Sequence, residues 1–227
     1  MPAPDPYATC PGNQKVLAYY AGTFDSVYVS LSPFIQPMAI APSVFCSEPY
    51  PSRQKVAEAC KSVTWREIMS LTGLPSLSQV DIGLRTRIGG LNKHHENKEF
   101  ADRITNLADT AGIIPPAEGE HSDFLHNQVL GLFQELGHEW VWVGDEFCTE
   151  RRLHWIEDLK TEMQPTIQGH CNVLSPDKSI LWTVHWDSHF SFICSSQENL
   201  NRLGIARRLE GFFCNPNTGV YWSLHET

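Results

Sequence analysis

The sequence predicts a single α+β domain over residues 1–227, with an antiparallel sheet built mainly from the C-terminal third and helices packed on one face. Two observations lead to this prediction. Helical spacing of apolar residues dominates the first two thirds of the chain, whereas short alternating segments joined by turn residues dominate the last third. The βαβ alternation typical of a parallel sheet is absent from the sequence pattern.

Helices are expected where apolar residues recur every three or four positions between capping and stop residues. Ser52 is a typical N-cap, and the pair Thr64 and Glu67 forms a capping box. Residues 1–12 are Pro-rich and are expected to be an irregular leader. The expected helices cover residues 14–21, 52–61, 64–72, 96–111, 122–136, 149–163 and 199–205.

Strands are expected where apolar and polar residues alternate. Val80, Ile82 and Leu84 alternate with polar residues or glycine, which indicates a half-buried strand that continues to Ile88. Trp140 and Trp142 share one face of another strand and are expected in the core. The expected strands cover residues 26–31, 80–88, 139–143, 172–174, 179–186, 190–194, 211–214 and 220–224.

The segment 180–194 contains no Gly or Pro, and its even positions are mostly apolar. A three-residue loop at 187–189 would pair Trp186 with Phe190 and keep one buried face, so this register is favoured over a two-residue loop. One long bent strand is the alternative. The three-residue loop and the bent strand both bury Trp186, so we expect Trp186→Ala to cost about 3–5 kcal/mol and His189→Ala less than about 1 kcal/mol.

Composition excludes several classes of protein. The 227 residues hold 17 Lys+Arg against 26 Asp+Glu, a net charge of -9, and 41% are hydrophobic. This composition excludes a disordered chain, and the acidic balance argues against nucleic-acid binding. No apolar run reaches the length of about 18 residues that spans a membrane. Seven widely spaced cysteines without C-x-x-C and no basic N-terminal region predict a cytoplasmic protein with reduced thiols.

One candidate site is the polar rim of the segment 180–194, which consists of His185, Asp187 and His189. His185 and Asp187 have the spacing of a facial triad, and His225, or alternatively His170, could be the third ligand of a divalent metal ion. A metal-dependent enzyme is therefore one hypothesis. The other interpretation is a polar hairpin tip without a cofactor, in which Asp187 bonds nearby backbone N–H groups.

Other motifs leave the question of an enzyme open. Arg85 and Arg87 lie on one face of the expected strand beside Asp81, and could clamp a carboxylate or phosphate. A solvated strand face is the alternative. Phosphate loops, G-x-S-x-G, H-E-x-x-H and G-x-G-x-x-G are absent from the sequence.

The segments Val184–Ile193, Glu210–Cys214 and Trp140–Val143, with Tyr221 and Trp222, resemble bacterial families of unknown function. Such families include immunity-type proteins, which bind a partner toxin and carry no catalytic motif. The resemblance implies a binding protein and assigns no catalytic residue.

We therefore expect a binding protein of immunity or sequestration type whose partner has a basic surface. Its surface would join acidic residues to exposed aromatic residues, since aromatic anchors supply affinity while charge mainly sets the association rate. The expected contact residues are Asp145, Glu146, Asp187, His189, Arg85 and Arg87. Charge reversal at Asp145 and Glu146 is expected to slow association without affecting stability.

Overall fold

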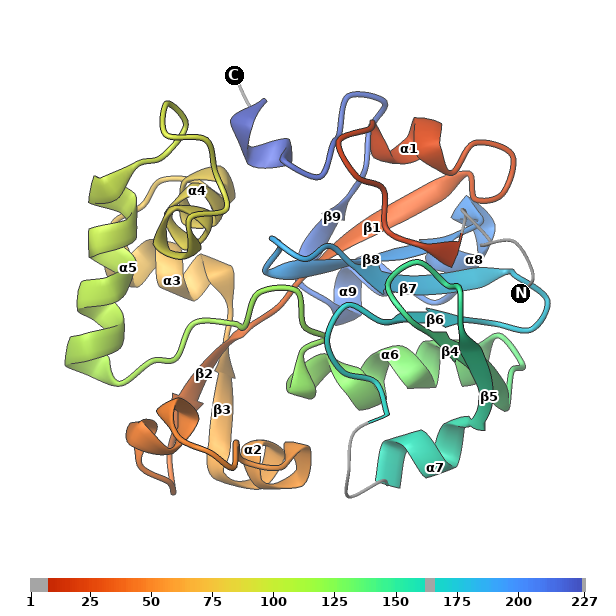
Figure 1. Ribbon diagram of the computed structural model, residues 1–227, viewed down its shortest axis with the longest axis horizontal. Helices are drawn as coiled ribbons and strands as arrows, with labels where there is room; N and C mark the ends of the chain where they lie inside the picture. Colours follow the sequence, from red (N-terminus) through yellow and green to blue (C-terminus); the bar gives the residue numbers. More distant parts are fainter. Residues whose placement is uncertain (1–7, 162–165, 226–227) are drawn as a thin grey trace. The chain divides into compact units, whose positions relative to one another are not determined.

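The structure is a computed structural model that describes residues 8–161 and 166–225. It confirms the α+β fold: helices accompany a seven-stranded antiparallel sheet with the strand order β5-β4-β6-β7-β8-β1-β9 (Figure 1). The strands are β1 (Ser26–Leu31), β4 (Trp140–Gly144), β5 (Arg151–Trp155), β6 (Asn172–Leu174), β7 (Ile180–Val184), β8 (Phe190–Ser195) and β9 (Gly211–Phe213). All except β1 come from the last part of the chain, as the sequence predicts.

The chain forms two compact units whose segments alternate along the sequence. The first unit contains Gly119–His121, Leu125–Val220 and the N-terminal residues up to Leu31, and therefore the whole seven-stranded sheet. The second contains Ser32–Glu118, Ser122–Phe124 and the residues from Tyr221 on. That the two units fold as a single domain stays a prediction.

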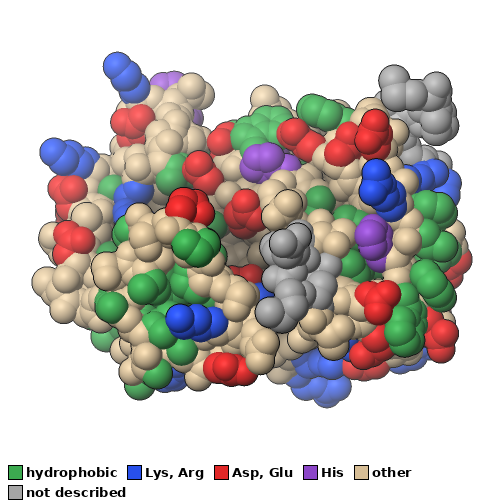
Figure 2. Space-filling model, turned by 60° about the horizontal axis from the view of Figure 1, so that its bottom comes forward, with side chains coloured by type: hydrophobic (Ala, Val, Ile, Leu, Met, Phe, Trp, Pro, Cys, Tyr) green, Lys and Arg blue, Asp and Glu red, His purple; other side chains and the backbone are tan. Residues whose placement is uncertain are grey.

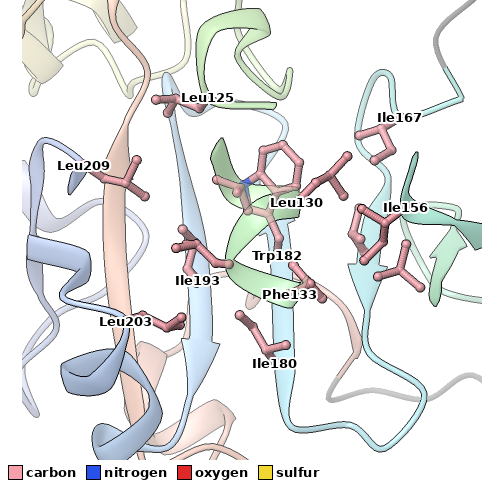
Figure 3. Close-up of a cluster of buried hydrophobic side chains, with 14 of the residues drawn as sticks. Leu125, Leu130, Phe133, Ile156, Ile167, Ile180, Trp182, Ile193, Leu203 and Leu209 are labelled. Carbon is pink, nitrogen blue, oxygen red and sulfur yellow. The ribbon is translucent and has the colours of Figure 1, made fainter. Parts of the chain in front are cut away.

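The core of the first unit lies on the sheet face that carries Trp182. Helix α6 (Asp123–Glu135) supplies Leu130 and Phe133, which surround the Trp182 ring together with Ile193 (Figure 3). Helices α7 (Ile156–Thr161), α8 (Gln197–Arg202) and α9 (Ile205–Arg208) add further side chains to the same cluster. These four helices therefore pack on one face of the sheet as predicted, although not every helix of the unit lies there (Figure 1).

The opposite face of the central strands is buried as well. Every residue of β1, β7 and β8 is buried, although successive side chains of a strand point to opposite faces. Tyr20, next to the short helix α1 (Val16–Tyr19), is fully buried and lies beside Cys194 of β8. Figure 1 shows α1 and α6 on opposite sides of the sheet. The N-terminal segment thus helps to cover the second face.

The second unit is mainly helical and has a two-stranded sheet. Ser52 caps the helix α2 (Arg53–Ala59) as predicted, and both hydrogen bonds of the predicted capping box form at Thr64 and Glu67. Its elements are β2 (Phe34–Pro37), η2 (Pro42–Cys46), α2 (Arg53–Ala59), β3 (Cys60–Val63), α3 (Trp65–Thr72), α4 (Leu77–Ile88), α5 (Lys98–Ala111) and η3 (Trp222–Leu224). Neither β2 nor β3 was predicted.

Two strand predictions in this unit are wrong. Residues 80–88 belong to helix α4, which Ser76 caps by accepting a hydrogen bond from the Gln79 N–H and which ends at Gly89 in the left-handed conformation. Gly83 made this segment look like an alternating strand, but its small size serves a helix contact. A Cβ at this position would lie 2.8 Å from the Ile104 side chain of α5. Residues 222–224 form the 3-10 helix η3 instead of a strand.

The helix predicted from Thr149 is also wrong over its first half. Residues 151–155 form β5, which pairs with β4, and α7 begins only at Ile156. Thr149 does not cap a helix, since its N–H and its hydroxyl both donate to the Asp145 carboxylate and close the turn between the two strands. Met163, expected on that helix, lies outside the described residues.

The favoured register of the hairpin 180–195 is wrong by one residue. Val184 pairs with Ser191, and Trp182 pairs with Ile193, which is the register of the two-residue loop. The prediction assumed that only one sheet face is buried. Because both faces of β7 and β8 are buried, pairing a polar residue with an apolar one does not waste a core face.

No helix in residues 8–161 and 166–225 is long and apolar enough to cross a membrane. All seven cysteines are thiols in the structure.

Candidate functional site

The hairpin of β4 and β5 forms one edge of the seven-stranded sheet. Its register pairs Trp140 with Trp155, and Trp142 with Leu153. Val141 and Val143 point to the core of the first unit. Because strand residues alternate between faces, the four paired residues lie together on the opposite face. We call Trp140, Trp142, Leu153 and Trp155 the hairpin face.

The hairpin face is substantially open to solvent. Trp140 is 48% exposed, Leu153 is 44% exposed and Trp155 is 42% exposed, while Trp142 is partly buried. On the right of Figure 2, the side on which β5 lies in Figure 1, hydrophobic side chains gather at the surface beside Asp and Glu. The prediction that Trp140 is a core residue is therefore wrong, although its shared face with Trp142 is confirmed.

The turn between the two strands is held by the Asp145 carboxylate. It accepts hydrogen bonds from the Thr149 N–H at 2.7 Å, from the Thr149 hydroxyl and from the Glu150 N–H at 3.4 Å. Burial raises the pKa of Asp145, but these hydrogen bonds outweigh it and hold the pKa below its ordinary value. Phe147 in the same turn is 61% exposed.

A buried asparagine fixes this turn to the sheet. Asn172 of β6 donates from Nδ2 to the main-chain carbonyls of Asp145 at 2.7 Å and Glu146 at 3.0 Å. Its Oδ1 accepts a hydrogen bond from the Thr183 hydroxyl of β7. The register aligns Gly144, Asn172 and Thr183 across the sheet, so the turn at 145–150 and the turn at 185–189 lie at the same end. The structure thus brings two predicted contact segments to one sheet end.

The turn at 185–189 differs from the expected polar rim. His185 and His189 are each only 2% exposed, whereas Trp186, which was expected to be buried, is 45% exposed. The Asp187 N–H donates to His185 Nδ1 at 3.2 Å, and the Asp187 carboxylate accepts from the Trp186 indole N–H at 3.0 Å. This turn therefore orients its histidines inward.

The structure gives no geometric support to a metal centre in its described part. No three His, Cys, Asp or Glu side chains among residues 8–161 and 166–225 are placed so that they could hold a metal ion. His225 is exposed and belongs to the second unit, whereas His185 and Asp187 belong to the first. The metal-dependent alternative stays a prediction.

Arg85 and Arg87 do not act as one clamp, because they lie on a helix and not on a strand. Arg85 and Asp81 are both fully buried and form an ion pair at 2.9 Å. The Ser223 hydroxyl donates to the same carboxylate at 2.6 Å, and the Arg85 guanidinium lies over the Tyr221 ring at 4.6 Å. These contacts hold the C-terminal residues on α4. Arg87 is exposed and donates to the Thr105 hydroxyl.

The second unit also contains a shallow groove of about 400 Å³. Leu71, Leu107 and Ile113 supply apolar walls, and Lys61 lies 3.9 Å from Glu67 at its rim. Because these two charges neutralise each other, the groove offers no strong charge for a ligand. It was not predicted from the sequence.

The fold and the hairpin face define an α+β protein with a seven-stranded antiparallel sheet whose edge hairpin exposes aromatic side chains. Residues 12–224 match the family described as "Protein of unknown function (DUF2711)", so the chain belongs to that family. It is also similar to "Uncharacterized protein YwbB" of Bacillus subtilis (strain 168), with 18% identity over 174 residues, covering 76% of this chain and 77% of that protein. The predicted resemblance to bacterial families of unknown function is confirmed. No solved structure matches.

Leu153 and Trp155 are the site residues that the sequence interpretation missed. They were placed on a helix, so their pairing with Trp142 and Trp140 could not be seen. One available signal was the pair of aromatic segments on either side of residues 145–150. That turn contains no glycine, and Cys148 supplies its left-handed position with φ 53°.

Proposed function

We propose that this protein binds a basic partner protein through the hairpin face, in the cytoplasm of a bacterium. The observation that carries the proposal is the grouping of three large apolar side chains, each more than two fifths exposed, on one side of an edge hairpin. Monomeric soluble proteins rarely expose large contiguous apolar patches, and patches of that kind mark interaction surfaces. Tryptophan is enriched among the few residues that carry most of the binding energy of an interface.

Charge around the hairpin supports a basic partner. Residues 139–158 contain six Asp or Glu against two Arg, in a chain whose net charge is -9. Glu139, Asp145, Glu146 and Glu150 lie at the ends of the two strands, and so flank the apolar centre. An acidic rim speeds the approach of a basic partner, while desolvated aromatic side chains slow its departure.

The site residues have different parts in this proposal. Trp140 and Trp155 would be anchors, and Glu146 and Glu150 would attract the partner. The Asp145 carboxylate is occupied inside the turn, so reversing its charge would break the turn and confound the test. Binding itself would be the activity, as in an immunity or sequestration protein.

The test uses a partner retained from a bacterial extract by the immobilised chain and then purified. Its association rate and dissociation constant are measured with the wild type, with Trp155→Ser, and with the double variant Glu146→Lys and Glu150→Lys. Trp155→Ser is expected to weaken binding by about tenfold or more through faster dissociation. The double charge variant is expected to slow association and flatten its salt dependence.

Glu96→Lys is the control for a charge reversal elsewhere, because Glu96 is exposed and belongs to the second unit. It changes net charge without touching the hairpin. The proposal fails if Trp155→Ser binds like the wild type, or if Glu96→Lys slows association as much as reversal at Glu146 and Glu150.

A further inference from the structure

The structure shows which backbone groups of β5 face away from the sheet. The Asp145 N–H donates to the Glu150 carbonyl at 3.0 Å, and the Ile156 N–H donates to the Glu139 carbonyl at 2.9 Å. In an antiparallel pair, residues that exchange hydrogen bonds alternate with residues that do not. Arg152 and His154 therefore bond to β4, and the N–H and C=O groups of Leu153 and Trp155 point outward.

Within the described residues, β4 is the one strand that pairs with β5, which stands at the end of the strand order. Four of the five β5 residues are exposed, and His154 is partly buried. An exposed edge of this kind accepts a further strand. The outward backbone groups belong to the same residues whose side chains form the hairpin face. A strand added here would thus gain main-chain hydrogen bonds and aromatic contacts together.

We infer that β5 accepts an extended segment of the basic partner as an additional, antiparallel strand of the sheet. This inference rests on the proposed function and specifies how that surface binds. Residues of the incoming strand that lie opposite Leu153 and Trp155 would place their side chains on the hairpin face, so they should be apolar. The intervening residues would lie beside Arg152 and His154, so they should be uncharged and polar.

Charge selects the occupant. Acidic residues stand at both ends of the hairpin: Asp145, Glu146 and Glu150 at the turn, and Glu139, Glu157 and Asp158 at the other end. A segment with cations at both ends matches this arrangement. A second copy of the chain, which also carries a net charge of -9, would bring two acidic hairpins together.

The probe is the synthetic peptide Lys-Lys-Val-Thr-Val-Thr-Val-Lys-Lys, titrated into the whole chain. Binding is followed by the amide NMR signals of β5 and by hydrogen exchange. In the free chain, the amides of Leu153 and Trp155 are expected to exchange faster than those of Arg152 and His154. The peptide should protect the Leu153 and Trp155 amides and leave the other two unchanged.

Two matched pairs make the test specific. N-methylation of the valine amides, which would face β5, is expected to weaken binding by about tenfold, whereas N-methylation of the threonine amides is expected to leave it unchanged. In the chain, Leu153→Pro removes an outward N–H at a position where an edge strand tolerates proline, and should abolish protection. Leu153→Val keeps the N–H and an apolar side chain, so the peptide should still protect the Trp155 amide in this variant.

Several results would overturn the inference. The inference fails if the two N-methylated peptides bind equally well, or if the unmodified peptide does not bind at about 1 mM. It also fails if the protein forms a dimer through this edge that Leu153→Pro dissociates. Its failure is distinguishable from that of the proposed function. If Leu153→Pro binds the purified partner like the wild type and Trp155→Ser does not, the surface binds without strand addition. If Trp155→Ser also binds normally, the proposed function fails as well.

Discussion

The centre and the edge of the same sheet use tryptophan in different ways. Trp182, in the central strand β7, is fully buried, and its indole N–H donates to the Ser191 hydroxyl at 2.9 Å. Trp155, in the edge strand β5, is 42% exposed. Both tryptophans lie on one face of a strand whose neighbouring side chains point to the other face, so strand periodicity alone does not tell which of them is buried. The difference comes from what covers each face, because helix α6 packs over Trp182.

Truncation at the two positions should therefore have very different costs, and this is the largest effect we expect. Trp182→Ala should lower the free energy of unfolding by about 3–5 kcal/mol, because it leaves a cavity in the core. Trp155→Ala should lower it by less than about 1 kcal/mol, as is usual for an exposed position. Chemical denaturation of both variants measures the difference. Similar losses would mean that β5 is covered in solution.

The sequence was sufficient for the fold class because period and capping are local properties. The box at Thr64 and the strand at Ser26–Leu31 depend only on neighbouring residues, and the structure confirms both. It was not sufficient where burial depends on distant segments. The hairpin register was assigned from one buried face, but residues near Tyr20 help to bury the second.

The candidate site was predicted in part for the same reason. Acidic residues joined to exposed aromatic residues were expected, and the structure places the Asp145 turn beside the hairpin face. Which aromatic residues are exposed could not be predicted, because Trp140 and Trp186 have the same sequence periodicity as core residues. Arg85 was misplaced because Gly83 interrupts the helical pattern where α4 meets α5.

The turn between β7 and β8 also contains one buried and one exposed side chain, and substitutions there should differ in stability by a smaller amount. The structure reverses the expected order of two substitutions there, because His189 is 2% exposed and Trp186 is 45% exposed. His189→Ala should cost about 1–3 kcal/mol, as loss of a buried polar side chain does. Trp186→Ala should cost less than about 1 kcal/mol. Urea denaturation of both decides the order, and a larger loss for Trp186→Ala would restore the original expectation.

The smallest effect concerns the Asp145 turn at the sheet edge and depends on pH. Because hydrogen bonds from Thr149 and Glu150 hold the folded pKa of Asp145 below its ordinary value, the charged carboxylate stabilises the fold. This contribution is complete above the ordinary pKa of an aspartate, and it is lost as the pH falls through the lower folded pKa. Asp145→Asn should therefore lower the melting temperature near neutral pH, and the difference from the wild type should vanish in strong acid.

Glu146→Gln is the control for this pH dependence, because Glu146 contacts Asn172 through its main-chain carbonyl and not through its carboxylate. It removes the same charge at the neighbouring position, and its melting temperature should follow that of the wild type across the titration. A difference between Asp145→Asn and the wild type that persists or grows in acid would contradict the prediction. The stability of the edge turn would then come from packing, as it does in the buried centre of the sheet, and not from the ionised carboxylate.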